Sequence, residues 1–401
     1  MMSLIKNIFY LGVVKFSRLI IPLLIIPVLS NVFSKEYLSY YFTANLVAAW
    51  VAIIIDYAFD YSMVRKITGK AGKNKFTHNA LVGVLHVKVI VLIFLTITSL
   101  AYSLYDNIGL YVFWGVLLGA AQSFSPVWLY MAVNKVLKVS VVTLLVNLVF
   151  LPLCLLVSND QGLWGLLLGL VLLRLSGAIY LTLPYLSLYN VVLSSAKLKS
   201  YFIWGWSMFR FQALASLYTS FPGFYYTLVG SHSGITAFGI ADRVTKAGGA
   251  ALSPIIQAVY PFICRMINTK DDELKSRRKF LACFQIGSAA LYVIFIYLFS
   301  EIITSYLIAD WMYAEKILKI YSWSIFFVSI SNVYGVQGIL ALGYIKPFNK
   351  VILAVTITHF PLLIILSKYY DGLGVAYSIV ISEFISAFLM FLLYRVLIKN
   401  D

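Results

Sequence analysis

Long apolar runs separated by short polar segments fill most of this 401-residue chain. A run of about 20 apolar residues is long enough for an α-helix to cross the hydrocarbon core of a bilayer. The pattern predicts twelve such helices, at 9–33, 38–63, 80–104, 108–133, 139–158, 162–186, 201–229, 235–263, 281–300, 317–342, 351–367 and 373–397. The longest connecting segments, 64–79 and 264–280, are too short for a folded domain. The sequence therefore predicts an all-α polytopic membrane protein.

The composition agrees with this interpretation. Hydrophobic residues make up 62% and charged residues only 11% of the chain, whereas soluble domains are about 25% charged. A net charge of +16 would point to nucleic acid in a soluble protein. Here the basic residues lie mostly in short loops, so we expect no nucleic-acid partner. The three cysteines lack CxxC spacing and the four histidines are scattered, so the sequence predicts no metal site and no cofactor.

The positions of Lys and Arg predict the orientation, because basic loops tend to stay in the cytoplasm. With a cytoplasmic N-terminus, 20 of the 31 basic residues fall in cytoplasmic segments, 4 on the opposite side and 7 inside apolar runs. Eleven or thirteen spans would place the C-terminus outside and weaken this asymmetry. We therefore predict twelve spans with both termini cytoplasmic.

The two halves of the chain show weak similarity. The segments "WLYMAVNKVLKVSVVTLLVNLVFLP" (128–152) and "QGILALGYIKPFNKVILAVTITHFP" (337–361) are each followed by a short polar loop and a glycine, Gly162 or Gly372. Paired halves around a central cleft are common in transporters. We predict an N-terminal six-helix bundle at 1–190, a cytoplasmic linker at 191–200 and a C-terminal six-helix bundle at 201–401, arranged around a central cavity.

Charged side chains inside the apolar runs are the candidates for function. Each costs on the order of 3 kcal/mol at the bilayer centre, so such residues usually face a water-filled cavity or one another. The basic ones are Lys15, Arg18, Lys88, Arg174, Arg210, Arg243 and Lys246, and the acidic ones are Asp56, Asp60, Asp242 and Glu383.

Some of these residues have a local explanation. Lys88 can snorkel to the inner interface, and Asp60 lies beside a basic loop. Asp242 can pair with Arg243 or with Lys246, which follows one helical turn later. Bases nevertheless outnumber acids seven to four, whereas a purely structural network would tend toward balance. The surplus predicts a cavity that receives an anion, and phosphate suits the planar donor fork of arginine.

Two segments resemble signatures of the polysaccharide repeat-unit flippases. In "QSFSPVWLYMAVNKV" (122–136), the resemblance to the fourth-span signature is carried by Pro126, Trp128 and Tyr130, with Ala132 where glycine is common in the family. In "GITAFGIADRVTKAGGAALSPIIQAVYPFICR" (234–265), the residues that resemble the span-eight block are Gly239, Ala241, Arg243, Pro254, Gln257 and Pro261. The resemblance extends over nearly the whole chain in length, span number and loop pattern.

This resemblance implies a member of the multidrug/oligosaccharidyl-lipid/polysaccharide exporter superfamily in the bacterial inner membrane. Members are similar to two six-helix bundles around a cationic cavity. They move undecaprenyl-pyrophosphate-linked oligosaccharide, such as an O-antigen repeat unit, from the cytoplasmic to the periplasmic leaflet by alternating access. The implied partners are that lipid-linked oligosaccharide, membrane lipids, and a polysaccharide polymerase with its chain-length regulator.

The resemblance also implies roles for the charged residues. The expected substrate-binding cavity cations are Arg18, Arg210 and Arg243, followed by Arg174 and Lys246. Family members are thought to couple transport to an ion gradient, and the candidate carriers are Asp56, Asp60, Asp242 and Glu383. No motif selects one of these four.

Two other functions stay open. A multidrug/cation antiporter of the same superfamily needs a net acidic pocket, whereas bases exceed acids inside these runs. A polysaccharide polymerase or an O-antigen ligase resembles chains with a large periplasmic loop, and every predicted periplasmic loop is short here. We therefore expect a transporter with no catalytic residues rather than an enzyme.

Overall fold

The computed structural model describes residues 21–67, 75–106, 108–133, 135–186, 195–266 and 272–400. Within these ranges the chain forms helices, turns and bends, and no strand. The chain divides into two compact units. Unit 1 comprises residues 1–216 and 223–228, and unit 2 comprises residues 217–222 and 229–401.

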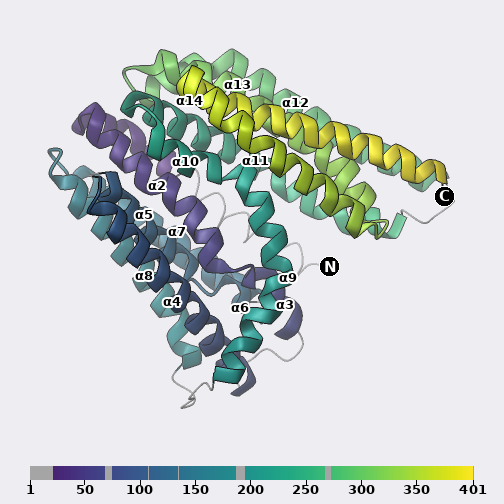
Figure 1. Ribbon diagram of the computed structural model, residues 1–401, viewed down its shortest axis with the longest axis horizontal. Coiled ribbons are helices and arrows are strands. Elements are labelled where there is room, and N and C mark those ends of the chain that lie inside the picture. Colours follow the sequence, from purple (N-terminus) through teal and green to yellow (C-terminus); the bar gives the residue numbers. More distant parts are fainter. Residues whose placement is uncertain are drawn as a thin grey trace. The chain divides into compact units, whose positions relative to one another are not determined.

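Unit 1 is a bundle of helices with short connections (Figure 1). An apolar helical stretch at Ile21–Val32 comes first. The helices that follow are α2 (Lys35–Asp56), α3 (Phe59–Ile67), α4 (Lys75–Ser103), α5 (Ile108–Ser123), α6 (Val127–Ala132), α7 (Val136–Leu155), α8 (Gly162–Leu186) and α9 (Ser195–Thr219). The short α10 (Phe221–Val229) contributes residues to both units.

Helix α5 lies at the centre of unit 1, where it packs against α2, α4 and α8. Its closest approach to α2 uses Gly115 and Gly119. A Cβ atom on Gly115 would lie 2.8 Å from the carbonyl oxygen of Ala44, and one on Gly119 would lie 2.9 Å from that of Ala48. Small residues at a four-residue spacing let helix backbones approach closely in membranes. The GxxxG spacing of α5 is therefore a packing surface.

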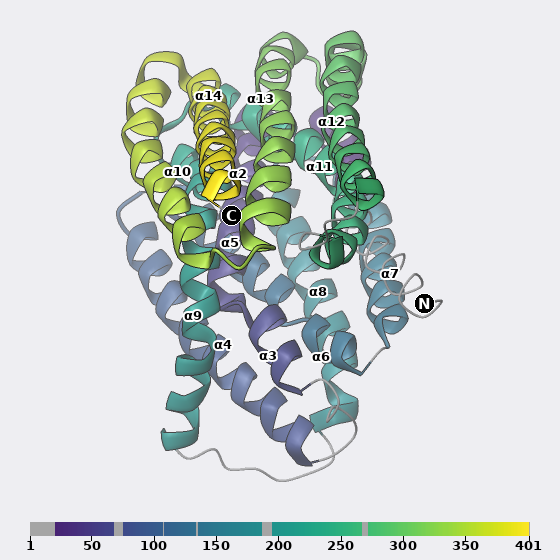
Figure 2. The same cartoon turned by 90° about the vertical axis from the view of Figure 1, so that its right-hand side faces the viewer.

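Unit 2 contains long helical segments, of which α13 packs against the other three (Figure 2). They are α11 (His232–Met266), α12 (Asp272–Leu307), α13 (Trp311–Ser331) and α14 (Ile345–Asn400), and the π-helix η1 (Asn332–Leu340) continues α13. Helix α14 is a hairpin rather than one rod, because Asp371 interrupts it with φ 50° and ψ −130°. The hydrogen bond between His359 and Ser382 joins its two limbs.

Both units use an aspartate to hold the start of a long helix. In unit 1 the backbone N–H of Ser34, which precedes α2, donates to Asp160 Oδ1 at 2.8 Å. In unit 2 Ser231 precedes α11, and its hydroxyl donates to Asp371 Oδ2 at 2.7 Å. Each aspartate stands one or two residues before the glycine, Gly162 or Gly372, that the sequence comparison of the halves singled out. The matching contacts support an internal repeat.

Large apolar side chains cover the outward faces of several helices. Ile93, Phe94 and Ile97 on α4 are each more than half exposed, and Leu291 and Leu298 on α12 are exposed as well. Soluble monomers rarely expose such extended apolar surfaces. Among the described residues, eight helices are long and apolar enough to cross a membrane. The chain is therefore a multi-pass membrane protein.

The observed helices follow the predicted runs, with breaks that the pattern did not predict. Helix α8 covers 162–186, the range that was expected. The runs 38–63, 108–133 and 201–229 are each interrupted, and 317–342 changes from α-helix to π-helix. The predicted boundary at 191–200 stays a prediction, because 187–194 lies outside the described residues and the contact-based division falls within 216–229.

Candidate functional site

In the described part of the chain, each unit has a lysine–aspartate pair between helical residues. The unit 1 pair is Asp56 and Lys88, and the unit 2 pair is Asp242 and Lys246. Isolated charges are costly in a bilayer, so each pair and the polar groups around it form a candidate site within its own unit.

The unit 1 pair sits where two helices end. Helix α2 ends at Asp56, because Tyr57 and Ala58 adopt left-handed φ values of 48° and 56°. Such conformations cost on the order of 1–3 kcal/mol each for residues other than glycine. Helix α5 ends at Ser123, three residues before Pro126. The N–H of Val127 donates to Ser125 rather than to the carbonyl of Ser123, which leaves that carbonyl oxygen available.

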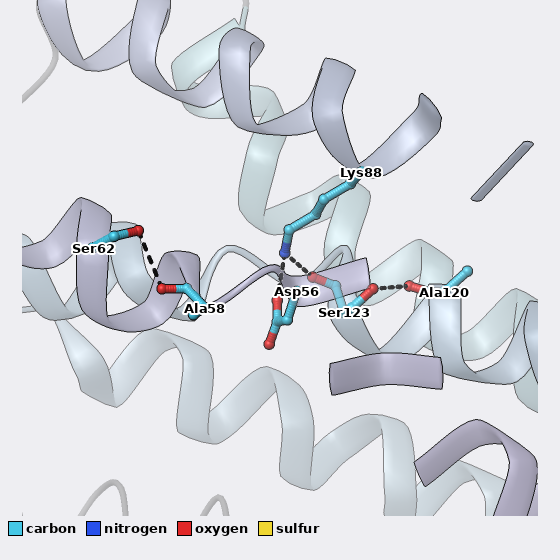
Figure 3. A network of polar contacts seen from close by, with 6 residues as sticks. All are labelled: Asp56, Ala58, Ser62, Lys88, Ala120 and Ser123. Carbon is cyan, nitrogen blue, oxygen red and sulfur yellow. Dashed lines mark hydrogen bonds and ion pairs between the residues drawn. The ribbon is translucent and has the colours of Figure 1, made fainter. Parts of the chain in front are cut away.

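Lys88 of α4 binds both of these ends (Figure 3). Its Nζ atom lies 2.6 Å from Asp56 Oδ1 and also donates to the carbonyl oxygen of Ser123. The side chain of Lys88 is 2% exposed and that of Asp56 is 26% exposed. A positive charge is favourable at a helix C-terminus, where the macrodipole is negative. Lys88 therefore neutralises the Asp56 carboxylate and donates to the carbonyl oxygen at the end of α5. Because its side chain is buried, the expectation that Lys88 snorkels to the membrane interface is wrong.

Aromatic contacts from α9 hold the break after Asp56. The ring of Tyr57 stacks on Phe209 with a centroid separation of 4.4 Å, and its hydroxyl donates to the carbonyl of Phe202 at 3.3 Å. The absence of a side chain at Gly205 makes room for this ring, because a Cβ there would lie 2.6 Å from Tyr57 Cδ1. The break is therefore a packed, defined feature of unit 1.

The unit 2 pair lies within one helix. Lys246 Nζ is 2.7 Å from Asp242 Oδ2, at the i,i+4 spacing that the sequence predicts. The hydroxyl of Tyr321 on α13 donates to the other carboxylate oxygen at 3.0 Å. Asp242 is buried, whereas a third of the Lys246 side chain is exposed. Phe238 stacks on the Tyr321 ring and fixes the orientation of its hydroxyl.

A second carboxylate, Glu383 on α14, lies deep in unit 2. It is 5% exposed. No lysine or arginine of the described part of the chain forms an ion pair with it. The preceding residue, Ser382, contacts Nδ1 of the fully buried His359 at 2.8 Å, and Nε2 of that ring has no partner among the described residues.

The π-helix η1 contributes a buried amide contact to unit 2. Gln337 Nε2 donates to Gln285 Oε1 at 2.7 Å, and both side chains are almost fully buried. The Ser329 hydroxyl donates to the backbone carbonyl of Gln285 at 3.2 Å. π-Helical segments within α-helices are frequent at functional positions. Sequence reasoning missed this pair, although two glutamines inside apolar runs were a visible signal.

The remaining candidate residues are distributed over both units. Arg18 lies outside the described residues. Arg174 on α8 is half-buried, and Arg210 on α9 is exposed with its guanidinium carbon 5.9 Å from the Trp206 ring. Arg243 on α11 is half-buried, and Asp60 lies half-buried in the first turn of α3. Among the predicted site residues that the structure describes, Asp242 pairs with Lys246, while Asp56 pairs with Lys88, which was not among them.

The candidate sites consist of charged and hydrogen-bonding side chains. Among the described residues, no group of three or more His, Cys, Asp or Glu side chains could hold a metal ion. The groups present are an ammonium held between two helix ends, a carboxylate shared by an ammonium and a phenol, and a buried carboxylate.

The fold is that of known membrane transporters. The chain is similar to the lipid II flippase MurJ in its inward closed conformation, with a TM-score of 0.76 and 15% identity over 97% of this chain and 87% of that one. It is also similar to an inward-facing MATE-family multidrug transporter of the MOP superfamily, with a TM-score of 0.65 and 16% identity over 98% of this chain and 95% of that one. At these identities the likeness establishes the fold.

Sequence comparison finds two relatives that carry the same, more specific name. The chain is 24% identical to a protein of Escherichia coli (strain K12) named "Putative O-antigen transporter", over 98% of this chain and 97% of the relative. It is 22% identical to a Shigella dysenteriae protein of the same name, over 94% and 96% of the two chains. No family model matches the chain. All four similar proteins are named as transporters or flippases rather than enzymes, as the sequence predicts for this chain.

Proposed function

We propose that this protein is a flippase for a lipid-linked oligosaccharide. In this proposal the substrate is an undecaprenyl-pyrophosphate-linked O-antigen repeat unit or a related one. The chain carries it from the cytoplasmic to the periplasmic leaflet of the bacterial inner membrane by alternating access. The near full-length similarity to O-antigen transporters and the fold shared with a lipid II flippase support this proposal.

The observation that carries the proposal is the excess of basic over acidic residues inside the apolar runs, seven to four. Lys88 and Lys246 bind aspartates in the structure. We therefore assign the diphosphate to the arginines, whose planar donor fork suits phosphate. We propose twelve spans, two six-helix bundles and cytoplasmic termini as the frame that holds them.

The test is complementation of a strain that lacks the gene. We expect Arg243→Gln and Arg210→Gln to lower surface polysaccharide about tenfold or more, because a charge-assisted contact is worth roughly 1.5–3 kcal/mol. Lipid-linked repeat units should accumulate at the same time. The matched control is Arg395→Gln, since Arg395 is an exposed arginine near the end of α14 whose guanidinium packs on the Phe391 ring. Full display by both test variants, at normal membrane levels, would contradict the cavity assignment.

We further propose that the coupling ion acts in unit 2, at Glu383 together with Asp242. Asp56 is already neutralised by a buried ammonium that has a second acceptor, so its charge is not available for exchange. Glu383 has no ion-pair partner among the described residues, and Asp242 shares its charge with a lysine that is partly exposed. An ion could therefore bind to these two carboxylates, neutralise them and dissociate again.

Reconstituted vesicles test the coupling. We expect Glu383→Gln to retain binding of the lipid-linked substrate while transport no longer responds to an imposed proton or sodium gradient. The folded fraction of the Asp56→Asn variant should keep its response to the gradient. An unchanged gradient response in Glu383→Gln would show that the coupling ion does not act at Glu383.

A multidrug antiporter remains the alternative, because the fold is also that of a MATE transporter. The same deletion strain distinguishes the two functions. Restored polysaccharide display without altered drug sensitivity supports the flippase, and the reverse result supports the antiporter.

A further inference from the structure

A groove runs between α7 and α8 on the surface of unit 1. Its volume is about 660 Å³, within the range of roughly 300–1,000 Å³ that is typical of ligand sites. The lining is formed by Leu137, Lys138, Val141, Val142, Leu145, Val146, Ser176, Gly177 and Tyr180. Most of these side chains are aliphatic, and the single charge belongs to Lys138.

The two helices approach closely at the floor of the groove because Gly177 has no side chain. A Cβ atom there would lie 3.0 Å from Val146 Cγ2 and 3.2 Å from Val142 Cγ1. The neighbouring side chains on α7 point outward, with Leu137 48%, Val141 45% and Leu145 53% exposed. The groove is therefore open to the surroundings of the protein, which in a membrane are lipid chains.

The charge lies at one end of the groove. Lys138 lies in the first turn of α7, and its Nζ atom is 4.6 Å from the centroid of the Tyr180 ring. This cation–π contact holds the ammonium at the mouth of the groove rather than free in solvent. Lys135, exposed just before α7, adds a second positive charge at the same end. The groove thus combines an apolar channel with a basic end.

The length of the groove matches one leaflet. From residue 137 to residue 146, α7 rises by about 13.5 Å at 1.5 Å per residue, roughly half of the ~30 Å hydrocarbon core. The basic end lies at the segment that the distribution of Lys and Arg predicts to be cytoplasmic. An acyl chain in the channel would therefore belong to the cytoplasmic leaflet, with its headgroup beside Lys138.

We propose that this α7–α8 groove binds one anionic phospholipid of the cytoplasmic leaflet, with an acyl chain along the groove and its phosphate group at Lys138. Charge complementarity selects an anionic headgroup, because juxtamembrane lysines attract anionic lipids by about 1 kcal/mol each. The open lining selects a bilayer lipid, because the lipid at the highest local concentration fills an exposed site by mass action. The proposal does not depend on which substrate the protein transports.

Native mass spectrometry of the purified full chain in a neutral detergent tests the proposal. Phosphatidylglycerol and phosphatidylcholine of identical acyl chains are titrated in parallel. We expect one phosphatidylglycerol to bind more tightly than phosphatidylcholine, and Lys138→Gln to weaken phosphatidylglycerol binding about five-fold, the equivalent of one lysine contact. Leu145→Trp should weaken binding of both lipids, because the indole would occupy the channel.

Two controls match these variants. Lys199→Gln removes an exposed lysine on α9, and Ile97→Trp places an indole on the exposed face of α4; neither residue lines the groove. Both controls should bind phosphatidylglycerol as the unchanged protein does. Equal binding of the two lipids, or an unchanged affinity in both Lys138→Gln and Leu145→Trp, would overturn the proposal. Displacement of phosphatidylglycerol by an equimolar polyprenyl diphosphate would also overturn it, because the groove would then belong to the substrate tail.

Discussion

The two lysine–aspartate pairs differ in what holds them together. The unit 1 pair joins α4 to the end of α2 across 32 residues of sequence, and the same ammonium also binds the end of α5. The unit 2 pair lies within α11 at i,i+4, and the phenol of Tyr321 ties it to α13. Lys88 is 2% exposed, whereas the Lys246 side chain is 33% exposed.

This difference separates a structural pair from an exchangeable one. Removing one partner of a buried ion pair costs about 3–5 kcal/mol, because the other charge is left buried and uncompensated. The Lys246 ammonium is partly exposed, so it can reach solvent when it leaves Asp242, and the buried carboxylate then keeps the Tyr321 hydroxyl as a donor. Loss of Lys88 leaves both the Asp56 carboxylate and the Ser123 carbonyl oxygen without its ammonium, so Lys88 is required to keep the helix ends of unit 1 in place.

The largest expected effect is on the stability of unit 1. We expect Lys88→Met to lower the free energy of unfolding by about 3–5 kcal/mol. Lys246→Met should lower it by about 1–3 kcal/mol, because the buried Asp242 carboxylate keeps the Tyr321 hydroxyl as a donor. Unfolding of the purified protein by sodium dodecyl sulfate, followed by tryptophan fluorescence, measures both.

The double variant Asp56→Asn with Lys88→Met separates loss of the pair from loss of packing. Removing both charges should recover a substantial part of the stability, because no uncompensated charge is left. Equal losses in Lys88→Met and Lys246→Met would show that the contrast between the two pairs is wrong.

The next effect concerns the glycine–tyrosine contacts that flank each pair. A Cβ at Gly205 would meet the inner atoms of the Tyr57 ring and lie 3.2 Å from the Tyr57 carbonyl, whereas a Cβ at Gly248 would meet the outer end of the Tyr292 ring. The outer end of a side chain can swing aside more easily than a backbone. We expect Gly205→Ala to cost about 1–3 kcal/mol, and Gly248→Ala to cost less.

Gly165→Ala is the matched control for both glycine variants. Nothing lies within 4 Å of a Cβ at Gly165, so alanine should be neutral or stabilise α8 by up to about 1 kcal/mol through helix propensity. Thermal unfolding in detergent compares the three variants. A larger loss in Gly248→Ala than in Gly205→Ala would indicate that the unit 2 pair is the more rigid of the two.

The sequence predicted local relations well. Apolar run length placed most helices, and i,i+4 spacing predicted that Lys246 pairs with Asp242, because both signals are properties of neighbouring residues. The match between 128–152 and 337–361 indicated a repeat, which the Ser34–Asp160 and Ser231–Asp371 contacts support.

Long-range relations were not predictable from the same signals. The break after Asp56 falls at Tyr57 and Ala58, without glycine or proline, so no local propensity marks it. It is imposed by α9, which arrives about 150 residues later with Phe209 and the open space at Gly205. The partner of Lys88 depends on this break, so sequence periodicity placed Lys88 on a helix but could not place its ammonium.

The smallest effect compares the two aspartates that hold the helix starts. Asp160 accepts from one backbone N–H, that of Ser34. Asp371 accepts from the Ser231 hydroxyl at 2.7 Å and, at 3.5 Å each, from the Ser231 N–H and the Tyr313 hydroxyl. We expect Asp160→Ala to cost about 1 kcal/mol, the usual value of a helix cap. Asp371→Ala should cost somewhat more, because alanine tolerates the φ of 50° less well than aspartate.

The asparagine variants refine this comparison of the two units. Asparagine keeps an acceptor oxygen and tolerates a positive φ, so Asp160→Asn and Asp371→Asn should each lie within a few tenths of a kcal/mol of the unchanged protein. Melting temperatures of the four variants, measured side by side in one detergent, test the order. If Asp371→Ala lost no more stability than Asp160→Ala, the extra contacts of Asp371 would contribute nothing to stability. The two helix starts would then be equivalent in energy as well as in structure.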